Sequence, residues 1–158
     1  MAILYGDDWP DLIDGTNGRD LIYGYGGDDD IYAGWGYDLV FGGSGDDYIN
    51  GGTGDDDLYG GSGQDRLIGG SGYDVLLGQA GNDDLYGGSG YDDLFGGSGL
   101  DYLNGGSSDD WLNGGSGRDW LVGAQAWTCS SLTVAHRGSG RQARIPSPTG
   151  MRQLTGST

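Results

Sequence analysis

The chain has 158 residues, a length typical of one domain; 38 of them are glycine, and the net charge is −17. All 24 acidic residues are aspartate, and neither glutamate nor lysine occurs. This charge argues against nucleic acids and anionic membranes as main partners, and the glycine content argues against helices. The single Cys129 rules out an internal disulfide framework, and no secretory signal or transmembrane segment is recognisable.

A nine-residue repeat runs in one phase over residues 6–122, giving thirteen units without an insertion. Its clearest copies, over residues 42–77, read GGSGDDYIN, GGTGDDDLY, GGSGQDRLI and GGSGYDVLL. We number the positions of each unit as places 1 to 9. Glycine is typical of places 1, 2 and 4, whereas place 6 is aspartate and place 8 is aliphatic in all thirteen units. Residues 3–5 precede the array in the same phase and are interpreted as an N-terminal half-coil.

The repeat predicts an all-β fold. Places 7 to 9 form a short strand with the place-8 side chain on one face, because side chains alternate along a strand. Places 1 to 6 carry turn residues. Two units make an 18-residue coil, and stacked coils give two parallel sheets with the place-8 residues packed between them. The loops of alternate units then line up along the two edges of the stack.

The loops favour calcium as a ligand. Aspartate supplies hard oxygen atoms, glycine carbonyls can converge on one point, and Ca²⁺ takes about 6–8 such oxygens. One loop is too small to fill this shell, so we expect each ion between loops one coil apart, such as those of Asp47 and Asp65, or of Asp56 and Asp74. Thirteen loops leave at most eleven gaps. Residues 6–123 carry 24 Asp and 3 Arg, a net charge of −21 that eleven Ca²⁺ (+22) would match.

The phrase GGxGxDxUx, where U is a large aliphatic residue, resembles the RTX (hemolysin-type) calcium-binding nonapeptide. The resemblance implies a parallel β-roll, a right-handed β-helix or solenoid of 18-residue coils that holds Ca²⁺ between its loops. It also implies an extracellular protein, exported by a type I route without a cleaved N-terminal signal, that folds on meeting calcium. The implied side-chain ligands are Asp20, Asp29, Asp38, Asp47, Asp56, Asp65, Asp74, Asp83, Asp92, Asp101, Asp110 and Asp119. The implied backbone carbonyl ligands are Gly43, Gly45, Gly52, Gly54, Gly61, Gly63, Gly70, Gly72, Gly88, Gly90, Gly97 and Gly99.

An aromatic column is expected on one outer sheet face. In alternate units, place 9 reads Tyr23, Phe41, Tyr59, Leu77, Phe95 and Asn113. One interpretation is a cross-strand ladder that only steadies the sheet. The other is a docking face for a partner or a second copy, which would make the chain an adhesive or structural module of a larger secreted toxin, surface protein or exported enzyme.

The sequence predicts no enzyme. It contains no HExxH, no GxSxG and no EF-hand loop, and its only histidine, His136, lies outside the array. The predicted calcium-binding domain is residues 1–123. Residues 124–158 contain no acid, carry four arginines and are rich in Ser and Thr, which indicates a basic tail that is disordered or a junction sequence of non-native origin.

Overall fold

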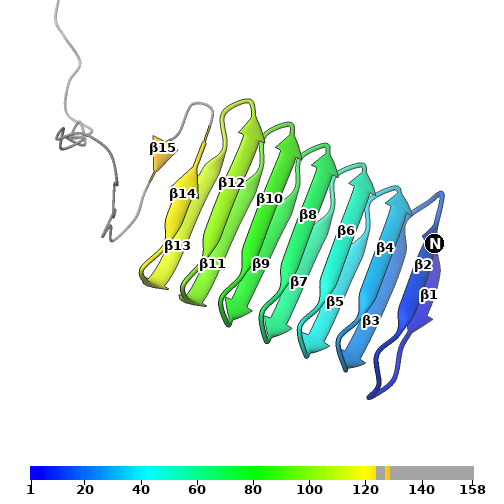
Figure 1. Cartoon of the computed structure of the whole chain (residues 1–158). Coiled ribbons are helices and arrows are strands. Elements are labelled where there is room, and N and C mark those ends of the chain that lie inside the picture. Colours follow the sequence, from blue (N-terminus) through cyan, green and yellow to red (C-terminus); the bar gives the residue numbers. More distant parts are fainter. Residues whose placement is uncertain (124–126, 129–158) are drawn as a thin grey trace, which may run out of the picture.

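The computed structural model describes residues 1–123 and 127–128, which form a stack of coils (Figure 1). These residues contain no helix, and therefore none long and apolar enough to cross a membrane. The remaining residues, which include Cys129, His136 and nearly all of the predicted tail, lie outside the described part of the chain.

Fifteen strands form two parallel sheets. The eight-stranded sheet has the order β1 (Ala2–Tyr5), β3 (Asp20–Gly26), β5 (Leu39–Ser44), β7 (Asp57–Ser62), β9 (Val75–Ala80), β11 (Asp93–Gly99), β13 (Trp111–Gly117) and β15 (Trp127–Thr128). The seven-stranded sheet has the order β2 (Leu12–Thr16), β4 (Asp30–Trp35), β6 (Tyr48–Thr53), β8 (Arg66–Ser71), β10 (Asp84–Ser89), β12 (Tyr102–Ser107) and β14 (Trp120–Val122). Consecutive strands alternate between the sheets, so the chain winds as a solenoid.

The register confirms the predicted 18-residue coil. Leu58 of β7 pairs with Leu76 of β9, and Ile49 of β6 pairs with Leu67 of β8. The last pairing differs, because Trp111 of β13 pairs with Trp127 of β15, sixteen residues on. The predicted parallel β-roll is therefore confirmed as an all-β solenoid.

The strands are longer than predicted, and the turns are shorter. β7 begins at Asp57, at place 7, and continues through two glycines to Ser62, at place 3. The prediction that places 1 to 3 belong to the turn is therefore wrong. The coils stack in register, so the backbone at these places still pairs one coil away, as Gly61 does with Gly43. Gly61 has a φ of +118°, which lets the strand bend without leaving the ladder.

The core is a narrow row of place-8 side chains between the sheets, joined by the buried Ala33 at place 1. Twelve are buried: Ile13, Ile22, Ile31, Val40, Ile49, Leu58, Leu67, Leu76, Leu85, Leu94, Leu103 and Leu112. Leu4 and Leu121 pack against the two ends of this row and are partly buried. The narrow core follows from the alternation of faces, since only place 8 of each triplet points inward.

The outer faces carry the polar and aromatic side chains of places 7 and 9. The predicted aromatic column is a stack in which Tyr5–Tyr23, Tyr23–Phe41 and Phe41–Tyr59 ring centroids are 5.7, 5.2 and 4.9 Å apart. The geometry is that of a cross-strand aromatic ladder.

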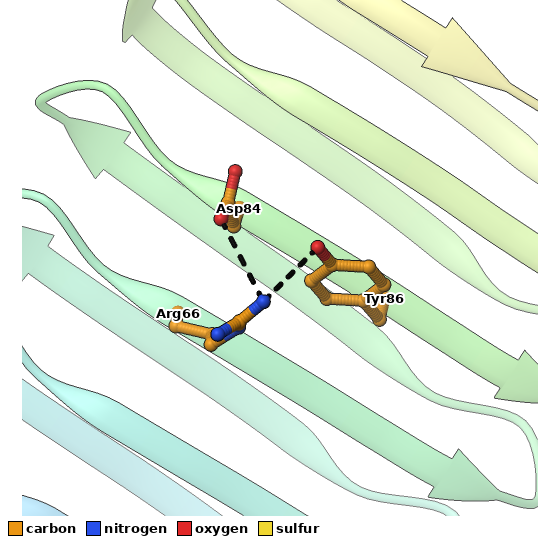
Figure 2. A network of polar contacts seen from close by, with 3 residues as sticks. All are labelled: Arg66, Asp84 and Tyr86. Carbon is orange, nitrogen blue, oxygen red and sulfur yellow. Dashed lines mark hydrogen bonds and ion pairs between the residues drawn. The ribbon is translucent and has the colours of Figure 1, made fainter.

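The opposite face holds a small polar network, drawn in Figure 2. Arg66 donates to the Tyr86 hydroxyl at 3.3 Å and lies 4.0 Å from Asp84, with its guanidinium carbon 5.3 Å from the centre of the Tyr86 ring. Because Arg66 and Asp84 are about half exposed, this ion pair contributes little to stability.

Truncating one core leucine should destabilise the whole stack. Leu67 is fully buried, so Leu67→Ala is expected to lower the free energy of unfolding by about 2–5 kcal/mol. The matched control is Leu12→Ala, because Leu12 is 68% exposed at place 7. Denaturant unfolding in saturating calcium measures both variants. Equal losses would contradict the narrow core of place-8 side chains.

Candidate metal centre

The loops of the solenoid are short and lie along its two edges. Between β6 and β7 only residues 54–56 lie outside the strands, corresponding to places 4 to 6. Place 6 ends this turn and directs its aspartate inward, next to the place-8 core. Each loop therefore contributes one inward carboxylate to a row that runs along the edge of the stack.

The structure buries eleven of the twelve predicted side-chain ligands. Their exposed fractions are at most 3%, and the eleven are Asp20, Asp29, Asp38, Asp47, Asp56, Asp65, Asp74, Asp83, Asp92, Asp101 and Asp110. Asp119, in the last unit, is only half-buried, as is Asp11 in the first unit. Burial at this level is rare for an ionisable side chain without a charged partner.

One oxygen of each buried carboxylate is hydrogen-bonded to the preceding coil. The Asp47 backbone N–H donates to Asp65 Oδ1 at 3.0 Å, and the Asp56 N–H donates to Asp74 Oδ1 at 2.9 Å. The two loops of each predicted pair are thus directly linked. Sequence reasoning missed this hydrogen bond, although the unbroken phase of place 6 is the signal that a repeated contact exists.

The other carboxylate oxygen has no hydrogen-bond donor in ten of these aspartates. The ten buried Oδ2 atoms belong to Asp29, Asp38, Asp47, Asp56, Asp65, Asp74, Asp83, Asp92, Asp101 and Asp110. A buried polar atom without a partner is costly, and a charged one far more so. These atoms are hard oxygen donors of the kind that calcium prefers, so the residues fit a row of calcium ions.

A glycine at place 1 leaves room beside nine of these ten oxygens, the exception being that of Asp38, whose unit has Ala33 at place 1. A Cβ on Gly51 would lie 2.6 Å from Asp56 Oδ2 and 2.8 Å from the carbonyl oxygen of Gly69. The carboxylate and a carbonyl of the next coil thus converge on one small space. Sequence reasoning did not include the place-1 carbonyls, although place 1 is glycine in every unit except that of Ala33.

The carbonyls predicted as ligands point along the stack. Gly45 O faces Gly63, and Gly43 O faces Gly61, so closely that a Cβ on the facing glycine would overlap the oxygen. The same holds for ten of the twelve predicted carbonyls: those of Gly43, Gly45, Gly52, Gly54, Gly63, Gly70, Gly72, Gly88, Gly97 and Gly99. These carbonyl oxygens therefore point toward the next coil, those of place 2 between paired strands and those of place 4 between successive loops.

Side chains alone do not form a metal cluster. Within the described residues, no group of three or more His, Cys, Asp or Glu side chains is placed to hold a metal ion. The reason is the spacing of the row, because each loop contributes a single inward carboxylate. Any ion in these gaps must take most of its ligands from the backbone.

Burial raises the pKa values of the inner aspartates. Desolvation, aided by neighbouring carboxylates, raises the pKa to about 7 for Asp65 and Asp74. It raises the pKa to about 6 for Asp47 and Asp56. At Asp20 burial also raises the pKa, but hydrogen bonds from Ala2 and Thr16 outweigh it and the net shift is downward. The aspartates in the middle of each row are therefore hard to ionise unless a cation is near.

Acid should favour the fold when calcium is absent. The folded pKa values of Asp65 and Asp74, about 7, exceed the unfolded value of 3.8, so the folded state binds more protons between these limits. This stability is fully present below the unfolded pKa and is lost as the pH rises through the folded pKa. In calcium-free buffer the sheet signal in far-UV circular dichroism should be larger at pH 5.5 than at pH 8. A larger sheet signal at pH 8 would contradict the burial of these carboxylates.

A side chain at place 4 should disturb the loop where coils are close. Gly63 has a φ of +134°, and a Cβ there would overlap Gly45 O, so Gly63→Ala should cost about 1–3 kcal/mol. Gly18 occupies the same place in the second unit with nothing within 4 Å of a Cβ, so Gly18→Ala is the control. Thermal unfolding with calcium present compares them. A loss at Gly18 as large as that at Gly63 would contradict the close approach.

Comparison with known proteins identifies the repeat. The family model described as the RTX calcium-binding nonapeptide repeat matches four times, over residues 5–40, 38–67, 59–94 and 95–125. The search of curated proteins gives no match. RTX repeats bind calcium, and the buried rows of aspartate agree with that chemistry. Because the matches cover most of the chain, this protein belongs to the RTX calcium-binding nonapeptide repeat family.

Proposed function

We propose that the chain is a secreted calcium-binding module whose array folds when calcium binds between its stacked loops. The observation that carries this proposal is the set of ten buried carboxylate oxygens without a hydrogen-bond donor. They lie in two in-phase rows, one on each edge, and nothing among the described side chains neutralises them. The array carries too few arginines to do so, since residues 6–123 contain 3 Arg against 24 Asp.

The proposed side-chain ligands are the place-6 aspartates from Asp20 to Asp119. The proposed backbone ligands are the carbonyls of places 2 and 4 between Gly43 and Gly99. Each ion would take oxygens from two loops one coil apart. The eleven gaps set an upper limit of eleven ions. The half-buried Asp119 supports weaker binding in the last gap, because its carboxylate is less enclosed.

Folding and binding are coupled through the carboxylates. In the unfolded chain the aspartates of neighbouring coils are separated by eighteen residues of flexible chain and do not form a joint site. In the folded chain they lie in one row and repel each other. Bound calcium supplies positive charge and a coordination shell, and an ion that binds only the folded state stabilises that state as its concentration rises.

An extracellular location follows from the same coupling. RTX repeats are typical of secreted proteins. A chain with uncompensated carboxylate rows would stay unfolded where free calcium is scarce, and would fold outside the cell. Export by a type I route is consistent with that order of events.

The module is proposed to have no catalytic activity of its own. RTX repeat solenoids are structural modules. The buried aspartates of this array accept hydrogen bonds from backbone N–H groups, and they are arranged in uniform rows rather than in one distinct site. Such a uniform arrangement suits ion binding and does not single out an acid–base pair.

A calcium titration followed by far-UV circular dichroism tests the proposal. The sheet signal should appear cooperatively with Ca²⁺ and not with equimolar Mg²⁺, which demands stricter octahedral geometry. Asp65→Asn should weaken apparent calcium affinity by about tenfold, or about 1.4 kcal/mol, because a buried anionic ligand is lost. Asp57→Asn removes the same charge from an exposed place 7 and is the control. A full sheet signal without calcium, unchanged by calcium, would overturn the proposal.

A second candidate function is adhesion through the aromatic ladder. The aromatic ladder consists of Tyr5, Tyr23, Phe41 and Tyr59, and Leu77 follows Tyr59 in register. It lies on an outer sheet face that no described element covers. Calcium-dependent self-association, measured by analytical ultracentrifugation and abolished by Tyr59→Ser plus Phe95→Ser, would support it. A monomer at all calcium concentrations would leave the ladder a stabilising feature of the sheet.

A further inference from the structure

Place 5 is the most variable loop position, yet it carries a recurring contact. In four units whose place 5 is Asp or Asn, the side-chain oxygen accepts a hydrogen bond from the place-5 N–H one coil further on. The four contacts are Asp28 with the N–H of Asp46 (2.9 Å), Asp46 with Gln64 (2.7 Å), Asp55 with Tyr73 (2.8 Å) and Asn82 with Leu100 (2.8 Å). These side chains lie on the loop surface, outside the inward rows of place 6.

Each contact holds one particular peptide group. The Gln64 N–H and the Gly63 carbonyl belong to the same planar trans peptide, so they point in opposite directions. The N–H points back to Asp46, and the carbonyl oxygen points forward to Gly81 of the next coil. Restraining the N–H therefore restrains the carbonyl.

The same side chain also packs against the glycine of that peptide. Asp46 Oδ1 lies 3.1 Å from the position of a Cβ on Gly63, Asp55 Oδ1 lies 3.0 Å from that of Gly72, and Asn82 Oδ1 lies 3.1 Å from that of Gly99. The side-chain oxygen therefore lies against the glycine of place 4 and also accepts the hydrogen bond from the N–H of place 5. Both contacts restrict the peptide that carries the place-4 carbonyl.

Gaps without this contact offer a comparison. Place 5 has no Asx acceptor at Tyr91, and beside it a cavity of about 260 Å³ opens between the loops of Tyr91 and Asp109. The bond from Gly90 N to Ser107 O in this gap is 3.3 Å. Other gaps without an Asx acceptor keep shorter bonds, with 2.8 Å from Gly36 N to Thr53 O and 2.9 Å from Gly63 N to Ala80 O, the same range as gaps with the contact. Ser108 in place of glycine also distinguishes this gap.

We infer that Asp or Asn at place 5 is a positioning residue, which restrains the peptide that carries the place-4 carbonyl of the following coil and so couples neighbouring gaps along one edge. Gly54 O and Gly81 O face the next coil without this contact, so the contact limits the motion of the carbonyl rather than setting its direction. The inference rests on the proposed function, in which that carbonyl is a calcium ligand. Asp46 is the central example. It belongs to the coil before Gly63, and Gly63 O points into the gap after it. The contact in one gap therefore restrains the carbonyl that points into the next gap.

Three variants test the role of Asp46 by calcium titration. Asp46→Ala removes the acceptor and should weaken apparent affinity by about two- to tenfold, the effect of one hydrogen bond, with a lower Hill coefficient. Asp46→Asn keeps the acceptor, as Asn82 does, and should stay close to the unaltered chain. Gln64→Ala changes a place-5 side chain that accepts no such bond and leaves its N–H intact, so it is the matched control.

A second readout reports the peptide itself. Amide hydrogen exchange at Gln64 in the calcium-loaded chain should be faster in Asp46→Ala and unchanged in Asp46→Asn. A general loss of stability would instead speed exchange along the whole stack. Exchange confined to Gln64 and its neighbours is the signature of the local contact.

A gain-of-contact variant keeps the test informative if Asp46→Ala does not fold. Gln64→Asn places an acceptor before the Asn82 N–H, where none exists now. It should tighten apparent calcium affinity about two- to tenfold and slow exchange of the Asn82 amide, as one added hydrogen bond would. No change in either quantity would count against the inference.

The outcomes separate this inference from the function beneath it. Equal effects of Asp46→Ala and Asp46→Asn would overturn the inference, because charge rather than the acceptor would then matter. So would a normal calcium response in Asp46→Ala. An unaltered chain that does not respond to calcium would overturn the proposed function itself, and this inference with it.

Discussion

The structure depends on how a carboxylate is held at place 6. One oxygen accepts a backbone N–H from the coil before, and the other is buried without a donor. The first contact joins coils, and the second leaves an electrostatic deficit that grows with every coil added. A narrow hydrophobic core is opposed by two rows of buried carboxylates. In the proposed function, a bound cation offsets this deficit.

Glycine makes this arrangement geometrically feasible. Carbonyl oxygens of one coil point at the glycines of the next, at distances where a side chain would overlap them. Close approach of backbones brings many oxygens to each gap while each loop supplies only one inward carboxylate. In the proposed calcium sites, main-chain oxygens would make up for the shortage of side-chain ligands. A glycine-rich loop has little conformational preference of its own, so contacts between stacked coils must fix its conformation.

The positions that vary between units lie on the surface, and their side chains change local contacts without changing the fold. Place 9 forms an aromatic ladder on one sheet, while Arg66, Asp84 and Tyr86 form a polar network on the other. At place 5, some loops carry an acceptor and others do not. Since each coil contacts mainly its two neighbours, such differences act locally, and individual gaps can differ in strength within one uniform stack.

Much of this protein was determined by the sequence alone. The nine-residue period, with place 8 always aliphatic and place 6 always aspartate, was sufficient to predict the coil length, the parallel sheets, the buried row and the pairing of loops eighteen residues apart. A periodic sequence predicts this much structure because the same alternation of inward and outward side chains repeats in every coil. The carboxylate–glycine chemistry of the repeat likewise pointed to calcium.

Only the tertiary structure decided the rest. It extended the strands through Gly61 and its equivalents, because backbone pairing depends on a neighbouring coil that the local sequence does not contain. It showed that Asp65 uses one oxygen for the Asp47 N–H and leaves the other free, which no residue pattern distinguishes. It also brought place-5 acceptors such as Asp46 against N–H groups that lie one full coil further along the chain. Hydrogen-bond direction is a property of stacked backbones, and it emerges only when the coils are assembled.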